Sequence, residues 1–73
     1  MKACILIRVL PGKGESALKA VRKFPEVKKA YFVFGRYDII ALAEASNYEA
    51  ISTLTAKINS IKELKSTESL IEA

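Results

Sequence analysis

The chain has 73 residues, of which 51% are hydrophobic and 27% charged, with a formal net charge of +4 and no histidine. This composition suits one small domain with its own core. It excludes a disordered chain, a disulfide or paired-cysteine site (Cys4 is the single cysteine), and histidine-based zinc or acid–base chemistry. No apolar run approaches the roughly 20 residues that cross a bilayer and no signal peptide opens the chain, so we expect a cytoplasmic, non-enzymatic domain without metal, cofactor or membrane partner.

Residues 2–10 form the first predicted strand, because apolar side chains occupy both of its alternating faces. One face carries Ala3, Ile5, Ile7 and Val9, and the other carries Cys4, Leu6, Arg8 and Leu10. Pro11-Gly12 stops this strand. A helix is predicted over residues 15–24, where apolar residues recur at helical spacing. It ends before Pro25, because the residue that precedes a proline avoids the helical region.

The densest group of positive charges lies at the end of this helix, in Arg22-Lys23 and Lys28-Lys29. The remaining basic residues are spread through the chain. Cations are favourable near a helix C-terminus, so we interpret the group as solvated charge around a helix end. A weak polyanion-binding patch is the alternative.

Two further apolar segments, residues 27–34 and 38–45, are predicted to form a hairpin around Gly35, since glycine readily adopts the positive φ of a tight turn. Asp38, the only aspartate, lies at the mouth of this turn beside a tyrosine and an arginine. A carboxylate in this place is suited to ligand contact. Aspartate is also a common turn residue that hydrogen-bonds its own backbone. The sequence leaves both interpretations open.

A second helix is predicted behind Ser46-Asn47-Tyr48-Glu49, which has the pattern of a capping box with Ser46 at the N-cap. Residues 64–72 alternate weakly and form the last predicted strand, with Thr67 and Ser69 on one face. The order β-α-β-β-α-β predicts an α+β, ferredoxin-like fold for a single domain over residues 1–73. Its four-stranded antiparallel sheet would carry both helices on one face.

Both faces of the predicted sheet are apolar, although the helices can cover only one of them. Tyr31 alternates with Ala30 and Phe32, and Ile40 and Leu42 alternate with small or apolar neighbours. An uncovered face of this kind would exceed the few hundred Å² of apolar patch that is usual for monomers. We therefore expect a symmetric homodimer at least.

Other chemistries lack residues that they need. The run of residues 29–34 has the basic and aromatic character of an RNA-recognition motif, but it lies on the second strand and not on the third. Residues 11–14 lack both paired cysteines and a complete phosphate-binding loop. Asp38 and Glu44 are the only acids on the central strands, a weak basis for acid–base work, and Cys4 is expected to be an inert small hydrophobe.

The whole chain resembles the ligand-binding half of the Lrp/AsnC transcription regulators, also called the RAM (regulation of amino-acid metabolism) domain. The most specific match is Gly35-Arg36-Tyr37-Asp38, which resembles the Gly-x-Tyr-Asp hairpin of that family. Residues 24–27 resemble the segment that leads into its second strand. Residues 64–69 resemble its closing strand, with Ser69 where threonine is usual. Full members carry an N-terminal helix-turn-helix, whereas the first predicted strand here begins at Lys2, so the resemblance is to a stand-alone module.

The resemblance implies dimers that assemble into rings, with a small effector, usually an amino acid, bound where dimers meet. Gly35, Tyr37 and Asp38 would line this site, Thr67 and Ser69 would be second candidates, and Arg36 occupies a variable position. Asp38 could bind the effector's ammonium group.

Full-length regulators of the family are further candidate partners, and no sequence-specific DNA binding by this chain alone is expected. An ACT-like amino-acid-sensing subunit remains the alternative function, and an RNA-binding module is the more distant one.

Overall fold

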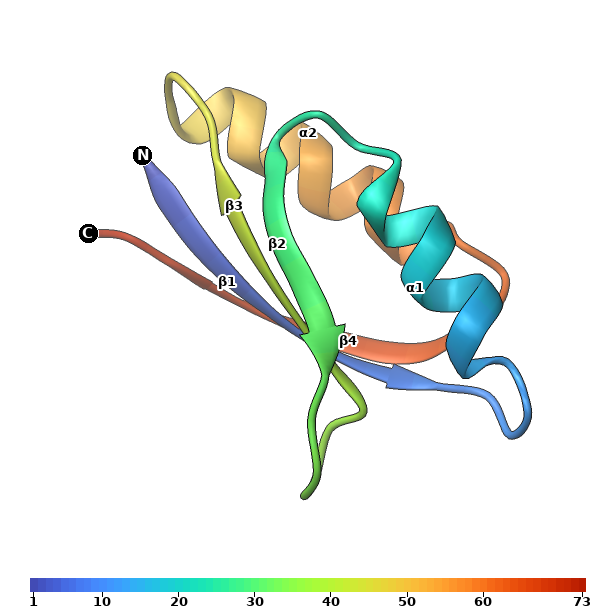
Figure 1. Cartoon of the computed structure of the whole chain (residues 1–73). Coiled ribbons are helices and arrows are strands. Elements are labelled where there is room, and N and C mark those ends of the chain that lie inside the picture. The colour runs from blue at the N-terminus through green and yellow to red at the C-terminus, as the bar shows by residue number, and fades with distance from the viewer.

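The computed structural model describes residues 1–73 and consists of one sheet and two helices. The elements are, in chain order, β1 (Lys2–Val9), α1 (Gly14–Arg22), β2 (Val27–Phe32), β3 (Ile39–Glu44), α2 (Tyr48–Asn59) and β4 (Leu64–Ile71). The strands pair antiparallel in the order β2-β3-β1-β4 (Figure 1). The predicted ferredoxin-like fold is confirmed. Neither helix has the length and apolar character needed to span a membrane.

The core lies between the sheet and the helices, and isoleucines dominate it. Ile5 and Ile7 of β1 are fully buried and pair with Ala41 and Ile39 of β3. The helices meet this face with their own fully or nearly fully buried residues, which are Ala17, Val21, Ile51, Leu54 and Ile58. The alternation of apolar residues along the strands and their helical spacing along the helices therefore direct apolar side chains into one core.

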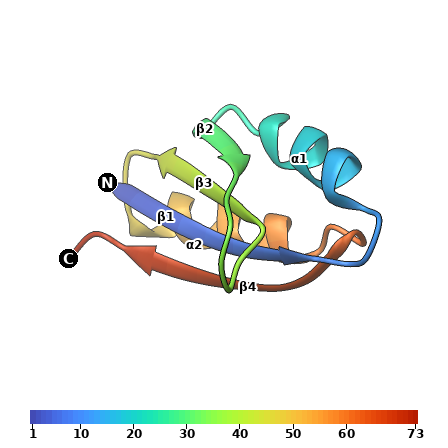
Figure 2. The same ribbon diagram turned by 60° about the horizontal axis from the view of Figure 1, so that its bottom comes forward.

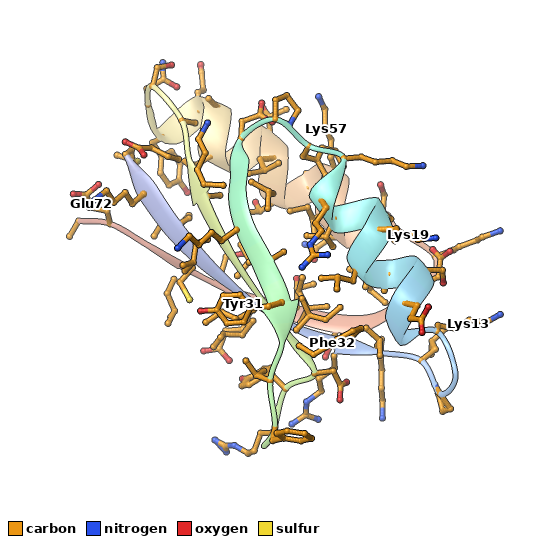
Figure 3. The ribbon with its side chains drawn as sticks, viewed as in Figure 1. Lys13, Lys19, Tyr31, Phe32, Lys57 and Glu72 are labelled. Carbon is orange, nitrogen blue, oxygen red and sulfur yellow. The ribbon has the colours of Figure 1, made fainter.

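The other face of the sheet, called the open face below, has no helix against it. Two rows of paired residues cross it: Tyr31, Ile40, Leu6 and Glu68 in one row, and Lys29, Leu42, Cys4 and Leu70 in the other. Figure 3 shows Tyr31 and Phe32 leaving β2 in opposite directions, with Phe32 on the side of α1. Tyr31 is 44% exposed and Leu70 is 53% exposed. The expected apolar second face is therefore present in the fold.

The predicted ends of β2 and α1 each lie two residues too far along the chain. β2 ends at Phe32 rather than at residue 34, because the chain turns away from the sheet after the hydrogen bond from Val33 N to Asp38 O (2.9 Å). α1 ends at Arg22 rather than at residue 24. The amides of Lys23 and Phe24 bond three residues back, at 3.3 and 3.4 Å, which tightens the last turn.

The predicted N-cap of α2 is wrong by one residue. Asn47, and not Ser46, has the extended conformation of a cap (φ −157°), and its Oδ1 accepts a 2.9 Å hydrogen bond from Ala50 N. Both residue types are good caps, so the pattern alone does not distinguish them.

The basic stretch surrounds the end of α1, and two of its cations have contacts within the chain. Arg22 donates from Nε and Nη2 to Ala30 O, at 3.0 and 2.6 Å, and so covers a carbonyl of the edge strand β2. Lys28 Nζ donates to Pro25 O at 3.2 Å. These contacts give both side chains a structural role.

Candidate functional site

The loop of residues 33–38 projects from one end of the sheet (Figure 1). In Figure 2 it passes in front of β1 toward β4, on the open face. Gly35 at its turn has φ +128°, a conformation that other residues rarely adopt, so the predicted positive φ of this glycine is confirmed. The loop carries four of the six predicted site residues.

Asp38 fixes this loop to the end of β1. Its amide donates to Ile7 O at 2.8 Å, and its Oδ2 accepts from Val9 N at 2.9 Å. The carboxylate thus accepts a hydrogen bond from the backbone of another strand. It does not bond the backbone of its own turn, which was the local interpretation that the sequence had left open. Asp38 is exposed, and its Oδ1 has no hydrogen bond within the chain. One carboxylate oxygen holds the loop while the other is open to a donor from outside.

Tyr37 lies on the open face between two charged residues. Its hydroxyl donates a 2.6 Å hydrogen bond to Glu68 Oε1, and the Arg8 guanidinium lies 5.5 Å from the centre of its ring. Arg8 Nε also donates to Arg36 O at 2.8 Å. The contacts tie the loop to both β1 and β4, so Tyr37 is held in one place before any ligand binds.

The hydrogen bond to Glu68 raises the pKa of Tyr37 above its ordinary value of 10.0. Desolvation and the negative charge of Glu68 act in the same direction, whereas Arg36 and Arg8 oppose them. The cause is direct: loss of the phenolic proton breaks the hydrogen bond and places an anion beside a carboxylate.

Arg8 and Glu68 were not among the predicted site residues. Arg8 had a signal, since it is a charged residue between the apolar Leu6 and Leu10 on one face of the predicted strand. Glu68 lies between Thr67 and Ser69, so alternation places it on the face opposite to them. The contact of Glu68 with Tyr37 depends on which strands are neighbours in the sheet, and no local sequence pattern shows the order of the strands.

Thr67 and Ser69 are separated from Tyr37 by the sheet. They pair with Ile7 and Ile5, so they share the face that carries the helices, and both are half-buried. Thr67 Oγ1 donates to Asn59 Oδ1 at the end of α2. Within one chain the structure brings Arg36, Tyr37 and Asp38 together and does not bring the two hydroxyl residues to them.

Neither of the two grooves of the chain contains a predicted site residue. One groove, of about 510 Å³, lies on the open face near the start of β1. The other, of about 490 Å³, lies along the edge of β2 and is lined by Arg22 and residues 27–31. No group of three or more metal-ligating side chains is present. The loop site is therefore an exposed set of polar groups without walls of its own.

Sequence comparison identifies the family of the chain. The model of the Lrp/AsnC ligand binding domain matches residues 2–72. The chain is 30% identical over 71 residues to the HTH-type transcriptional regulator FL11 of Pyrococcus horikoshii. The match covers 97% of this chain and 47% of FL11, so the chain spans about half the length of this relative.

Solved structures agree with this assignment. The crystal structure of FFRP-DM1 has a TM-score of 0.91 at 32% identity, over 99% of this chain and 97% of that one. The transcriptional regulator NMB0573 of Neisseria meningitidis, solved as an L-Met complex, has the same fold with a TM-score of 0.83 at 22% identity. That match covers 94% of this chain and 47% of the regulator. The chain belongs to the Lrp/AsnC family and consists, over residues 2–72, of its ligand-binding domain.

Proposed function

We propose that the chain is an effector-binding and oligomerisation module that binds a small molecule, most simply an amino acid, at the loop of residues 35–38. The observation that carries this proposal is the loop itself. Its polar groups are held rigidly by Arg8, Glu68 and the end of β1, yet one oxygen of Asp38 has no partner in the chain. Preorganised groups of this kind lose little entropy when they bind a ligand.

The chemistry of the loop suits a zwitterion. The free oxygen of Asp38 can accept a charge-assisted hydrogen bond from an ammonium group. The guanidinium of Arg36 and the backbone N–H groups at Gly35 can receive a carboxylate. The L-Met complex of NMB0573 supports an amino acid as the ligand class, although that relative is only 22% identical.

The open face supports a homodimer as the first step of assembly. Its two rows contain five apolar side chains in addition to Tyr31, and a monomer would leave them in contact with water. A second copy covers the same residues on both chains at once. Dimers would then assemble further, as rings, with each loop site completed by a neighbouring dimer.

Thr67 and Ser69 remain second candidates in this proposal. Because they lie on the helix side of β4, they would contact an effector only from a neighbouring chain. The same assembly could include full-length regulators of the family, since FL11 contains a comparable segment in about half of its length.

Native mass spectrometry of the chain with each of the proteinogenic amino acids tests this function. We expect an even number of chains per assembly, and one bound amino acid per chain for a small subset of the amino acids tested. A monomer that binds none of the amino acids would refute the proposal.

A further inference from the structure

Phe34, at the tip of the projecting loop, has no partner in its own chain. It is fully exposed, more than any other large apolar residue of the protein. A phenylalanine buries about 150–250 Å² when it is covered, and an exposed phenylalanine does not provide the stabilisation that comes from burying this apolar area. Gly35 next to it has no side chain, and its flanking space is empty. The tip is therefore an apolar projection.

The groove on the open face lies at the opposite end of the sheet. Its floor is apolar, because Cys4 of β1 pairs with Leu42 on one side and with Leu70 on the other. Its rim is charged and includes Glu44, Glu72 and several lysines. Its volume of about 510 Å³ is sufficient for an aromatic ring.

Phe34 cannot reach this groove within its own chain. The loop is fixed to Ile7 and Val9 at the end of β1, whereas the groove lies around Cys4 near the start of β1. Figure 3 shows Glu72, on the rim of the groove, at the end of the molecule far from the tip of the loop. Only a second copy can supply Phe34 to the groove.

We propose that the loop of each copy clasps the other copy, with Phe34 of one chain inserted into the open-face groove over Cys4 of its partner. This inference rests on the proposed dimer through the open face and specifies its arrangement. A two-fold axis in the interface, perpendicular to the strands, places the loop end of each sheet over the groove end of the other. Both insertions then form at once, as an isologous interface requires.

The position of the loop supports this arrangement. The loop lies on the side of the sheet that the partner would occupy, since Tyr37 crosses Arg8 to reach Glu68 on the open face. The rim of the groove carries three lysines as well as Glu44 and Glu72, so its charge is mixed and the apolar tip is the feature that fits the groove.

Disulfide trapping tests the insertion, because Cys4 is the only native cysteine and lies in the floor of the groove. The variant Phe34→Cys, oxidised under mild conditions, should form a covalent dimer in which the peptide of residue 34 is joined to that of residue 4. A disulfide forms only where the Cα atoms come within about 7 Å. The double variant Phe34→Cys/Cys4→Ser should remain uncrosslinked, and so should Lys57→Cys, whose residue lies on the exposed surface of α2.

A second variant keeps the test independent of the disulfide. Phe34→Ala should weaken dimerisation by roughly tenfold or more, as expected for truncation of a central aromatic anchor. Tyr48→Ala removes an aromatic residue that is 60% exposed on α2, and it should leave the dimer unchanged.

The outcomes separate this inference from the proposed function. A disulfide that persists in the Cys4→Ser background would show that the two tips meet each other, and it would overturn the insertion. So would a dimer of unchanged affinity in Phe34→Ala. A wild-type chain that sediments as a monomer would instead refute the open-face dimer itself.

Discussion

The hydroxyl of Tyr37 donates a 2.6 Å hydrogen bond to Glu68 Oε1, across the strand that separates them. The contact joins the β2–β3 loop to β4, two elements that are 31 residues apart in the sequence. Because Arg8 lies against the ring of the same tyrosine, the loop is held on the open face from two sides. The candidate site is thus formed by the fold as well as by its own motif.

This contact predicts a pH dependence. The pKa of Tyr37 is raised in the folded chain, above 10.0. The stabilisation that the proton provides is therefore complete below pH 10 and is lost as the pH rises through the raised pKa. Tyrosinate absorbance, taken as the difference between the wild type and Tyr37→Phe, should titrate above pH 10. In Glu68→Gln the same titration should move to lower pH. An identical midpoint in both proteins would show that the bond is not formed in solution.

The open face predicts a substitution that separates the subunits. Tyr31→Asp places a carboxylate in the proposed interface, where an unpaired charge costs several kcal/mol. We expect sedimentation to show one chain for this variant and at least two for the wild type. Tyr48→Asp makes the same exchange on α2 and should retain the wild-type mass. Loss of assembly in both variants would indicate a general effect of charge instead of an interface at the open face.

The N-cap of α2 predicts that substitutions at two adjacent residues differ in their effect on the free energy of unfolding. Asn47→Ala removes the acceptor for Ala50 N and should lower the free energy of unfolding by about 1 kcal/mol. Ser46→Ala removes no capping bond, so its effect should be within about 0.5 kcal/mol of zero. Thermal or urea denaturation of the two variants gives both values. A larger loss of unfolding free energy for Ser46→Ala than for Asn47→Ala would show that Ser46 is the N-cap, as the capping-box pattern in the sequence suggested.

Local sequence patterns were sufficient to predict the fold. The alternation around Ile5 and Ile7 and the helical spacing of Ile51, Leu54 and Ile58 report burial directly, since each depends on a few neighbouring residues. The ends of the elements were less accurate. The end of β2 depends on where pairing with β3 stops, and that point is set by contacts between the strands.

The candidate site was predictable only in part, for a similar reason. The alternation correctly placed Thr67 and Ser69 on one face. Which face they occupy is set by pairing with Ile7 and Ile5, and this pairing puts them on the helix side, away from Tyr37. Likewise, Asp38 was recognised from its turn, but its bond to Val9 joins strands that are distant in sequence. Site geometry that depends on the packing order of strands cannot be read from periodicity.

In the proposed function, Asp38 holds the ammonium group of an amino-acid effector. The variant Asp38→Asn tests this role, because asparagine keeps an oxygen that can accept from Val9 N but loses the charge. Calorimetric titration should use the amino acid that native mass spectrometry finds to bind most tightly. We expect affinity to fall roughly tenfold to a hundredfold, since a hydrogen bond to a charged group contributes about 1.5–3 kcal/mol. The assembly and its thermal stability should be retained. Equal affinity in the two proteins, with assembly intact, would contradict the claim and leave Asp38 as a residue that only fixes the loop to β1.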